Sequence, residues 1–113
     1  MAFDVEMPAI TSGILFNITM QVEEQFLDEW LTWIQHEHIP ATMGTGCFIK
    51  HQVLRLMIED DLAEPTYAIQ YFASSIYKFK QFDSVFREQL LKNISDKWDK
   101  QVMFFTTTME IVN

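Results

Sequence analysis

The chain has 113 residues, of which 16 are acidic and 8 are basic, and its formal net charge is -8. This length fits one domain and leaves no room for two independent cores. A hydrophobic fraction of 49% supplies enough apolar residues for a core and argues against disorder. The acidic balance opposes approach to phosphate backbones and anionic membrane surfaces, so we expect neither nucleic acid nor membrane as a partner.

The first residues of the chain and its cysteine content indicate the cellular compartment in which the protein is expected. Cys47 is the only cysteine and cannot form an internal disulfide, and the first residues lack the basic and apolar regions of a signal peptide. No apolar run approaches the ~18 residues that cross a bilayer. A cytoplasmic location is therefore expected. Residues 1–13 contain Pro8 and show no sustained periodicity, so they are predicted to be an N-terminal extension of a domain at residues 14–113.

The first half of the chain predicts a strand, a helix and a second strand. Residues 14–20 alternate with a period of two, which is typical of a strand. Apolar residues then recur at three- and four-residue spacing and predict a helix over residues 22–38. Pro40 disfavours helical geometry at the residue before it, so the helix is expected to end there. Residues 48–58 are rich in β-branched and aliphatic side chains and predict the second strand.

The second half predicts a strand, a helix and a final strand. The acidic loop at 59–65 connects the second strand to a strand at 66–73, and the pair is expected to form a hairpin. Ser74 or Ser75 can cap the helix that follows, because a serine hydroxyl accepts a hydrogen bond from the first turn. Residues 102–112 alternate again. The buried stripe of the second helix is predicted to be Phe79, Phe82, Phe86 and Leu90.

The element order βαββαβ predicts an α+β, ferredoxin-like fold. In this arrangement a four-stranded antiparallel sheet carries two helices on one face, and the first and third strands lie at its centre. The other face must be covered by a partner or tolerate water. Its composition therefore bears directly on function.

The two faces can be assigned if the more apolar side of each strand meets the helices. The helix-covered core would then consist of Ile14, Phe16, Ile18, Leu54, Leu56, Ile69, Tyr71, Phe105, Met109 and Ile111. The open face would consist of Asn17, Thr19, His51, Val53, Arg55, Met57, Ala68, Gln70, Phe72, Phe104, Thr106, Thr108 and Glu110. Such a face is apolar enough to be partly buried and polar enough to be selective.

Polar side chains of this open face are the candidate ligand contacts. Asn17 and Gln70 fall on the central strands and Arg55 on an outer strand, so they are expected to meet near the middle of the face. His51 is a further candidate there. Burying Arg55 without a partner costs several kcal/mol, so it needs a charged or multidentate neighbour if the face is covered. A small-molecule pocket and a hydrogen-bond network that sets dimer geometry are the two alternatives.

His38 is the remaining candidate for ligand binding. His36 and His38 project about 200° apart on a helix and cannot share a metal ion. The carboxylates between Glu59 and Glu64 lack the spacing of a calcium loop, so no metal site and no cofactor are expected. In the last turn of its helix His38 would interact with terminal carbonyls. Alternatively, it would reach the end of the sheet as an acid or base.

Two segments, Glu37 to Pro40 and Thr66 to Ala73, carry the most specific resemblance of this chain to a known family. They resemble a bacterial family of uncharacterised small proteins in the dimeric α/β-barrel superfamily, over about residues 14–112. The resemblance implies a homodimer in which two ferredoxin-like sheets face each other. It implies no reaction and no catalytic residue, since the superfamily includes cofactor-free monooxygenases, isomerases, haem enzymes and proteins with no known activity. Further segments that carry it are Leu15–Thr19, Trp30–Trp33 and Thr45–Phe48.

The sequence therefore predicts a homodimeric, small-molecule-binding domain that pairs through its open sheet face. The corresponding enzyme would be independent of cofactors and would act on an apolar or aromatic metabolite held between sheet and helices. The alternative is a non-catalytic dimerisation or protein-interaction module, whose polar face only specifies its partner.

Overall fold

The computed structural model describes residues 13–57 and 63–113. The predicted extension, apart from Gly13, and most of the predicted acidic loop lie outside these residues. The strands are β1 (Ile14–Val22), β2 (Lys50–Arg55), β3 (Thr66–Ala73) and β4 (Val102–Glu110). The helices are α1 (Leu27–Trp33), α2 (Ile39–Met43), α3 (Ile76–Val85) and α4 (Arg87–Trp98). Short turns of other helix types complete the helical layer: 3-10 turns at Glu24–Phe26 and Asp99–Gln101, and a π-helical turn at Ile34–His38.

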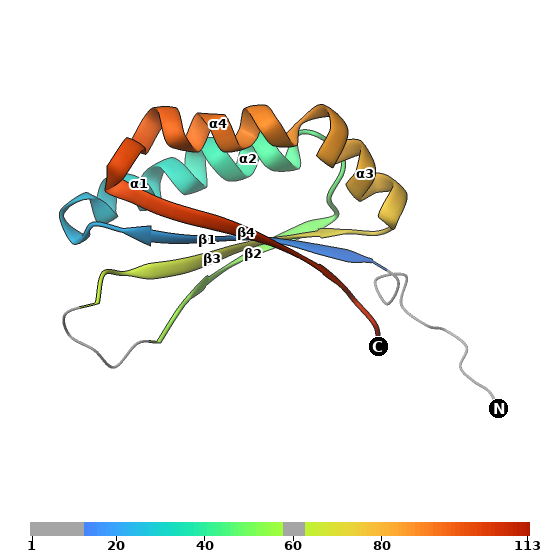
Figure 1. The fold of residues 1–113 in the computed structure, drawn as a ribbon, viewed down its shortest axis with the longest axis horizontal. Coiled ribbons are helices and arrows are strands. Elements are labelled where there is room, and N and C mark those ends of the chain that lie inside the picture. Colours follow the sequence, from blue (N-terminus) through green and yellow to red (C-terminus); the bar gives the residue numbers. More distant parts are fainter. Residues whose placement is uncertain (1–12, 58–62) are drawn as a thin grey trace.

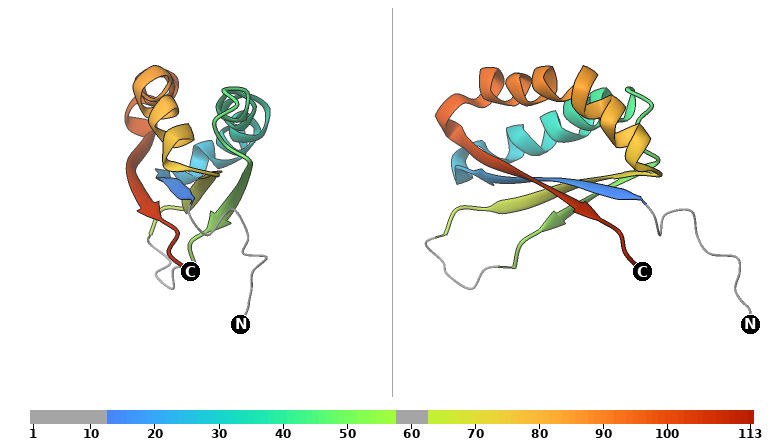
Figure 2. Two further views of the ribbon diagram at one scale, coloured as in Figure 1. Left: turned by 90° about the vertical axis from the view of Figure 1, so that its right-hand side faces the viewer. Right: turned by 45° about the vertical axis from the view of Figure 1, so that its right-hand side comes forward.

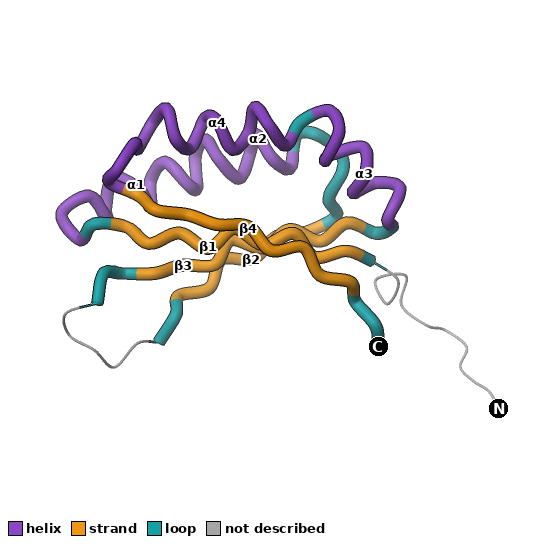
Figure 3. Tube along the Cα trace, viewed as in Figure 1, coloured by secondary structure: helices purple, strands orange, loops and turns teal. Residues whose placement is uncertain are grey.

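The four strands form one antiparallel sheet in the order β2-β3-β1-β4. The helices and short turns form two helical segments, the first at residues 24–43 and the second at residues 76–101. Both segments lie on the same face of the sheet, and the opposite face carries no described element (Figures 1 and 3). An end-on view shows the two helical segments side by side above the sheet (Figure 2). The predicted α+β ferredoxin-like fold, with the first and third strands at the centre, is confirmed.

The first helical segment does not end before Pro40. The N–H of Ile39 bonds to the carbonyl of Ile34, five residues earlier, and the helix continues through Pro40 to Met43. A proline inside an α-helix clashes with the carbonyl four residues before it. The wider π-helical turn relieves this clash, and the prediction that the helix ends at His38 is therefore wrong.

The second helical segment begins as predicted. Ser75 caps α3, because its Oγ accepts a hydrogen bond of 3.2 Å from the N–H of Lys78. A break at Phe86 separates α3 from α4. The predicted stripe meets the sheet along both helices, with Phe79, Phe82 and Leu90 buried and Phe86 half-buried.

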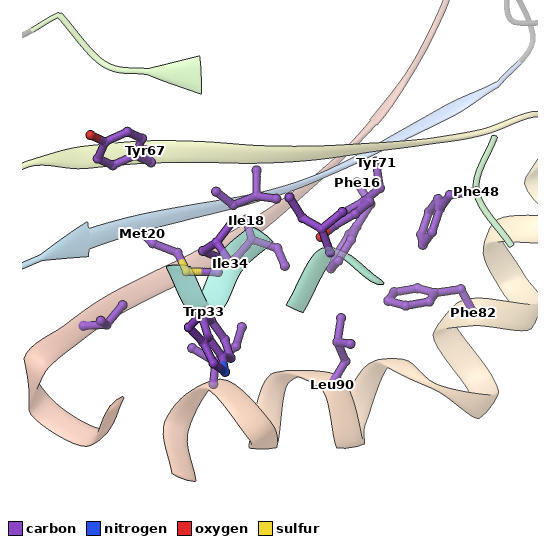
Figure 4. Close-up of a cluster of buried hydrophobic side chains, with 14 of the residues drawn as sticks. Phe16, Ile18, Met20, Trp33, Ile34, Phe48, Tyr67, Tyr71, Phe82 and Leu90 are labelled. Carbon is purple, nitrogen blue, oxygen red and sulfur yellow. The ribbon is translucent and has the colours of Figure 1, made fainter. Parts of the chain in front are cut away.

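Aromatic side chains dominate one end of the core between the two layers. Phe82 of α3 packs against Phe16 of β1 at 5.1 Å and against Phe48 at 4.8 Å between ring centroids (Figure 4). Tyr71 of β3 contacts Phe48 at 5.3 Å. Burying each such ring stabilises the fold by roughly 1.5–3 kcal/mol. This cluster fixes the distance between the helices and the sheet.

The face assignment is correct for the central strands and wrong for both outer strands. Direct partners in a sheet point to the same side. Val53 is paired with the buried Ile69, and Thr106 with the buried Ile18, so both lie on the helix side. The residues predicted on the open face that the register places on the helix side are His51, Val53, Arg55, Phe104, Thr106, Thr108 and Glu110. Those predicted in the core that it places on the open face are Leu54, Phe105 and Met109. Leu56 and Ile111, predicted in the core, and Met57, predicted on the open face, lie beyond the strand ends.

Candidate functional site

A chain of hydrogen-bonded side chains crosses the open face of the sheet. Gln52 of β2 donates from Nε2 to Oε1 of Gln70 at 2.7 Å. Gln70 of β3 donates in turn to Oδ1 of Asn17 at 3.3 Å, and Asn17 of β1 donates to the Thr19 hydroxyl at 2.9 Å. We refer to these four residues as the amide ladder. The predicted meeting of Asn17 and Gln70 is confirmed, whereas Gln52 was missed because the faces of β2 were assigned the wrong way round.

Arg55 and His51 do not join this ladder. Both belong to β2, and the pairing of His51 with Tyr71 and of Arg55 with Tyr67 directs them to the helix side, where they remain exposed. Arg55 lines a surface recess of about 310 Å³ together with Leu27 and other residues. The prediction that they meet Asn17 and Gln70 on the open face is therefore wrong.

His38 is buried between the helices and the sheet. Its imidazole lies 5.3 Å from the Trp33 ring and 6.0 Å from the Tyr71 ring, measured between centroids. Only 3% of the residue is exposed. Since the helix continues to Met43, His38 is not in a last turn and does not have the predicted terminal position. Burial lowers its pKa to about 4, so the imidazole is neutral at pH 7.

Several buried polar atoms around His38 have no hydrogen-bond partner among the described residues. They include Nε2 of His38, the hydroxyl of Tyr71 and Nε1 of Trp98. Burial raises the pKa of the Tyr71 phenol, an effect that the neighbouring Thr42 hydroxyl opposes without reaching full hydrogen-bond geometry. Leaving such a buried group unpaired costs roughly 1–3 kcal/mol.

These atoms belong to one aromatic cluster. Trp98 of α4 meets Trp33 of α1 edge to face at 5.8 Å, and Trp33 contacts His38, which contacts Tyr71. Figure 4 shows Trp33 between the helical layer and the sheet, and Tyr71 beside Phe16. Three of the four such atoms among the described residues therefore lie in one part of the layer between sheet and helices. The fourth is Nε1 of Trp30, whose ring packs against Tyr67 at 5.0 Å.

A groove on the helical side leads to this cluster. Its volume is about 390 Å³, which is within the range of small-molecule sites. The two helical segments form its walls, and His38 is part of its lining. No periodic pattern in the sequence identifies it, because its walls come from helices that β2 and β3 separate in the chain. The lining residues are Trp33, Glu37, His38, Ala41, Leu90, Asn93, Asp96 and Lys97.

The residues that the structure describes contain no group of three or more histidine, cysteine or acidic side chains placed to hold a metal ion. Within the same ranges, no helix has both the length and the apolar composition needed to cross a membrane.

The sheet order, the helices on one face and the side-by-side helical walls define a ferredoxin-like α+β protein. Residues 13–112 match the family described as Domain of unknown function (DUF4286), and the chain belongs to this family. The resemblance drawn from the sequence is thereby confirmed. A comparison with curated proteins gave no match.

Solved structures with low sequence identity share the fold. A dimeric ferredoxin-like protein from an uncultured marine organism is 13% identical, with a TM-score of 0.62 over 90% of this chain and 97% of its own. An EthD-like protein from Ralstonia eutropha is 13% identical, with a TM-score of 0.63 over 90% and 94%. A variant of SnoaB, a cofactor-independent oxygenase from Streptomyces nogalater, is 8% identical, with a TM-score of 0.59 over 87% and 91%.

Proposed function

We propose that this protein binds a small molecule in the groove at His38 and works as a homodimer. The observation that carries the ligand site is the buried, unpaired Nε2 of His38 beside a groove of about 390 Å³. A ligand group that bonds to the imidazole would offset the cost of leaving it unpaired. Of the ligand contacts predicted from the sequence, His38 is therefore the one that this proposal keeps.

The surroundings of His38 favour an apolar or aromatic ligand. Trp33 and Leu90 line the groove, and the imidazole itself stays neutral at pH 7. Aromatic ligands gain from offset or edge-to-face contact with such rings. The likeness to SnoaB, a cofactor-independent oxygenase, supports an enzyme that acts on such a metabolite without a bound cofactor.

The open sheet face supports the homodimer. Leu54 and Phe105 are 43% and 62% exposed there, on opposite edges of the sheet, with Met103 and Met109 beside Phe105. Large apolar side chains exposed together on one face commonly mark an interface. The likeness to structures described as dimeric ferredoxin-like proteins supports a second copy as the occupant.

Within this proposal the amide ladder sets the geometry of the dimer. Asn17 and Gln70 already bond to each other, and Asn17 is buried in the single chain. Each already makes two hydrogen bonds to side chains of the same face, so they serve specificity of pairing better than ligand capture. A buried polar network of this kind can fix one arrangement of two otherwise apolar surfaces.

A ligand screen by thermal unfolding tests the site. Compounds that bind the native state raise its stability by mass action, by about 2.7 kcal/mol at one hundred times Kd. We expect neutral aromatic compounds to raise the Tm of the wild type and of His36→Gln, an exposed change on the same helix. The same compounds should not raise the Tm of His38→Phe.

The screen also separates the two functions that the sequence left open. If no compound shifts the wild type, the domain is a non-catalytic dimerisation module and the ligand site is wrong. If compounds shift the wild type and His38→Phe equally, ligands bind elsewhere, and the recess at Arg55 becomes the site to examine.

A further inference from the structure

We propose that the groove at His38 selects neutral aromatic hydroxyl compounds and rejects carboxylates of the same size. This inference rests on the ligand site proposed above and names its ligand class. It follows from the charges around the groove and from the hydrogen-bonding capacity of His38, the buried polar residue in its lining.

Among the described residues that line the groove, acidic groups outnumber cations. Glu37 projects from one helical wall, and Asp96 and Lys97 from the other. The amine of Lys97 lies over the Trp98 ring, 5.6 Å from its centroid. Lys92, one turn before Asp96, is bound to that carboxylate at 2.7 Å. A carboxylate entering the groove would therefore meet the like charge of Glu37, and Lys97 is the one cation among the described lining residues.

The buried polar side chain in the lining of the groove is uncharged. His38 is neutral at pH 7, and the neighbouring Tyr71 phenol is also neutral there. A charged group brought to His38 would be buried without a counter-charge, which costs several kcal/mol. The penalty applies to any ionised group that reaches the imidazole, and a neutral polar group avoids it.

A hydroxyl suits this imidazole better than a group that only accepts. A neutral imidazole has one nitrogen that donates and one that accepts, and a hydroxyl both donates and accepts. It can therefore pair with Nε2 of His38 in either tautomer. An aromatic frame places the hydroxyl beside the rings of Trp33 and His38, which lie 5.3 Å apart between centroids.

Three matched probes test the ligand class by titration calorimetry at pH 7.5: 2-naphthol, naphthalene and 2-naphthoate. They share one ring system and differ in the hydroxyl or carboxylate. We expect the wild-type protein to bind 2-naphthol at least tenfold more tightly than either of the other two. The full chain is used throughout, and the comparison among probes in the wild type requires no variant to fold.

Two variants locate the selectivity. Glu37→Lys should improve 2-naphthoate binding severalfold relative to 2-naphthol, because it replaces a repelling charge with an attracting one. Glu29→Lys makes the same change of charge at an exposed position of α1 outside the groove, and its selectivity should match the wild type. His38→Phe, checked for native circular dichroism, should lose the preference for 2-naphthol over naphthalene.

The outcomes separate this inference from the proposed site. Binding of 2-naphthoate as tight as that of 2-naphthol, and weakened by His38→Phe, would overturn the ligand class and leave the site in place. Equal binding of 2-naphthol and naphthalene would overturn recognition of the hydroxyl. Failure of all three probes to bind the wild type would overturn both the ligand class and the proposed site.

Discussion

Gln70 donates a hydrogen bond to the buried Asn17 at 3.3 Å, and the two residues are direct partners in β3 and β1. Replacing Gln70 by Leu would remove the middle of the amide ladder, and both Gln52 and Asn17 would lose their hydrogen bond to it. We expect a loss of about 1 kcal/mol in the free energy of unfolding, measured by urea denaturation.

The matched control for this change is Gln89→Leu. Gln89 also bonds to an asparagine side chain, Asn93, but both lie exposed on α4. Its loss should change the free energy of unfolding by less than about 0.5 kcal/mol. Equal effects of the two substitutions would show that the ladder contributes no more than a surface hydrogen bond.

Phe105 tests the proposed interface on the open face. Phe105→Lys places a charge among the exposed apolar side chains that β4 contributes to the open face, and burying an unpaired charge costs several kcal/mol. We expect the variant to be a folded monomer at micromolar concentration by light scattering, and the wild type to be a dimer. Tyr77→Lys, at an 80% exposed position on α3, should stay dimeric. A monomeric wild type would refute the interface.

The stability of the protein should depend on pH through His38. Its pKa is lowered to about 4 in the folded state, from an ordinary value of 6.5. Above pH 6.5 the imidazole is neutral in both states and contributes no pH dependence. Between pH 6.5 and 4 the unfolded chain binds a proton that the folded chain does not, so stability falls with falling pH, by at most about 3 kcal/mol.

Urea denaturation of the wild type and His38→Phe between pH 7.5 and 4.5 measures this contribution. Other groups that titrate over this range act in both proteins, so the difference between the two curves isolates His38. Below pH 6.5 we expect the free energy of unfolding of the wild type to fall steadily relative to that of His38→Phe. His36→Gln, at an exposed position, should run parallel to the wild type. Parallel curves for His38→Phe would mean that His38 is solvated in the folded state.

The cap of α3 is a further point at which one hydrogen bond can be measured. Ser75→Ala removes the oxygen that accepts from the N–H of Lys78, and caps of this type contribute about 0.5–2 kcal/mol. Ser84→Ala is the control, because the Ser84 hydroxyl donates to the carbonyls of Lys80 and Gln81 within the same helix and caps no helix end. The thermal midpoint should fall clearly for Ser75→Ala and little for Ser84→Ala.

For the central strands, both the position in the chain and the buried side could be predicted from the sequence. For the outer strands, only the position could be predicted. In β1, apolar residues alternate with Asn17 and Thr19, so the buried side is evident. In β2 and β4, large apolar residues fall on both sides, as with Phe104 and Phe105. Alternation then cannot choose the face, and a shift of one residue exchanges the two sides. The pairing of Phe104 with the buried Met20 decides it.

The candidate site follows the same division. Asn17 and Gln70 could be placed together because both lie on strands whose faces are evident. The groove at His38 could not be predicted, because Pro40 signals the end of a helix. The hydrogen bond from Ile39 to Ile34 that overrides this signal has no marker in the sequence.

The π-helical turn makes the position of His38 depend on the number of residues in one turn. Removing a single residue from Ile34–His38 would restore α-helical spacing and rotate the imidazole by about 100° relative to Trp30. It would then no longer lie beside Tyr71, although every side chain of the site would still be present. Members of the family that conserve this site should therefore tolerate substitutions in this turn more readily than an insertion or a deletion.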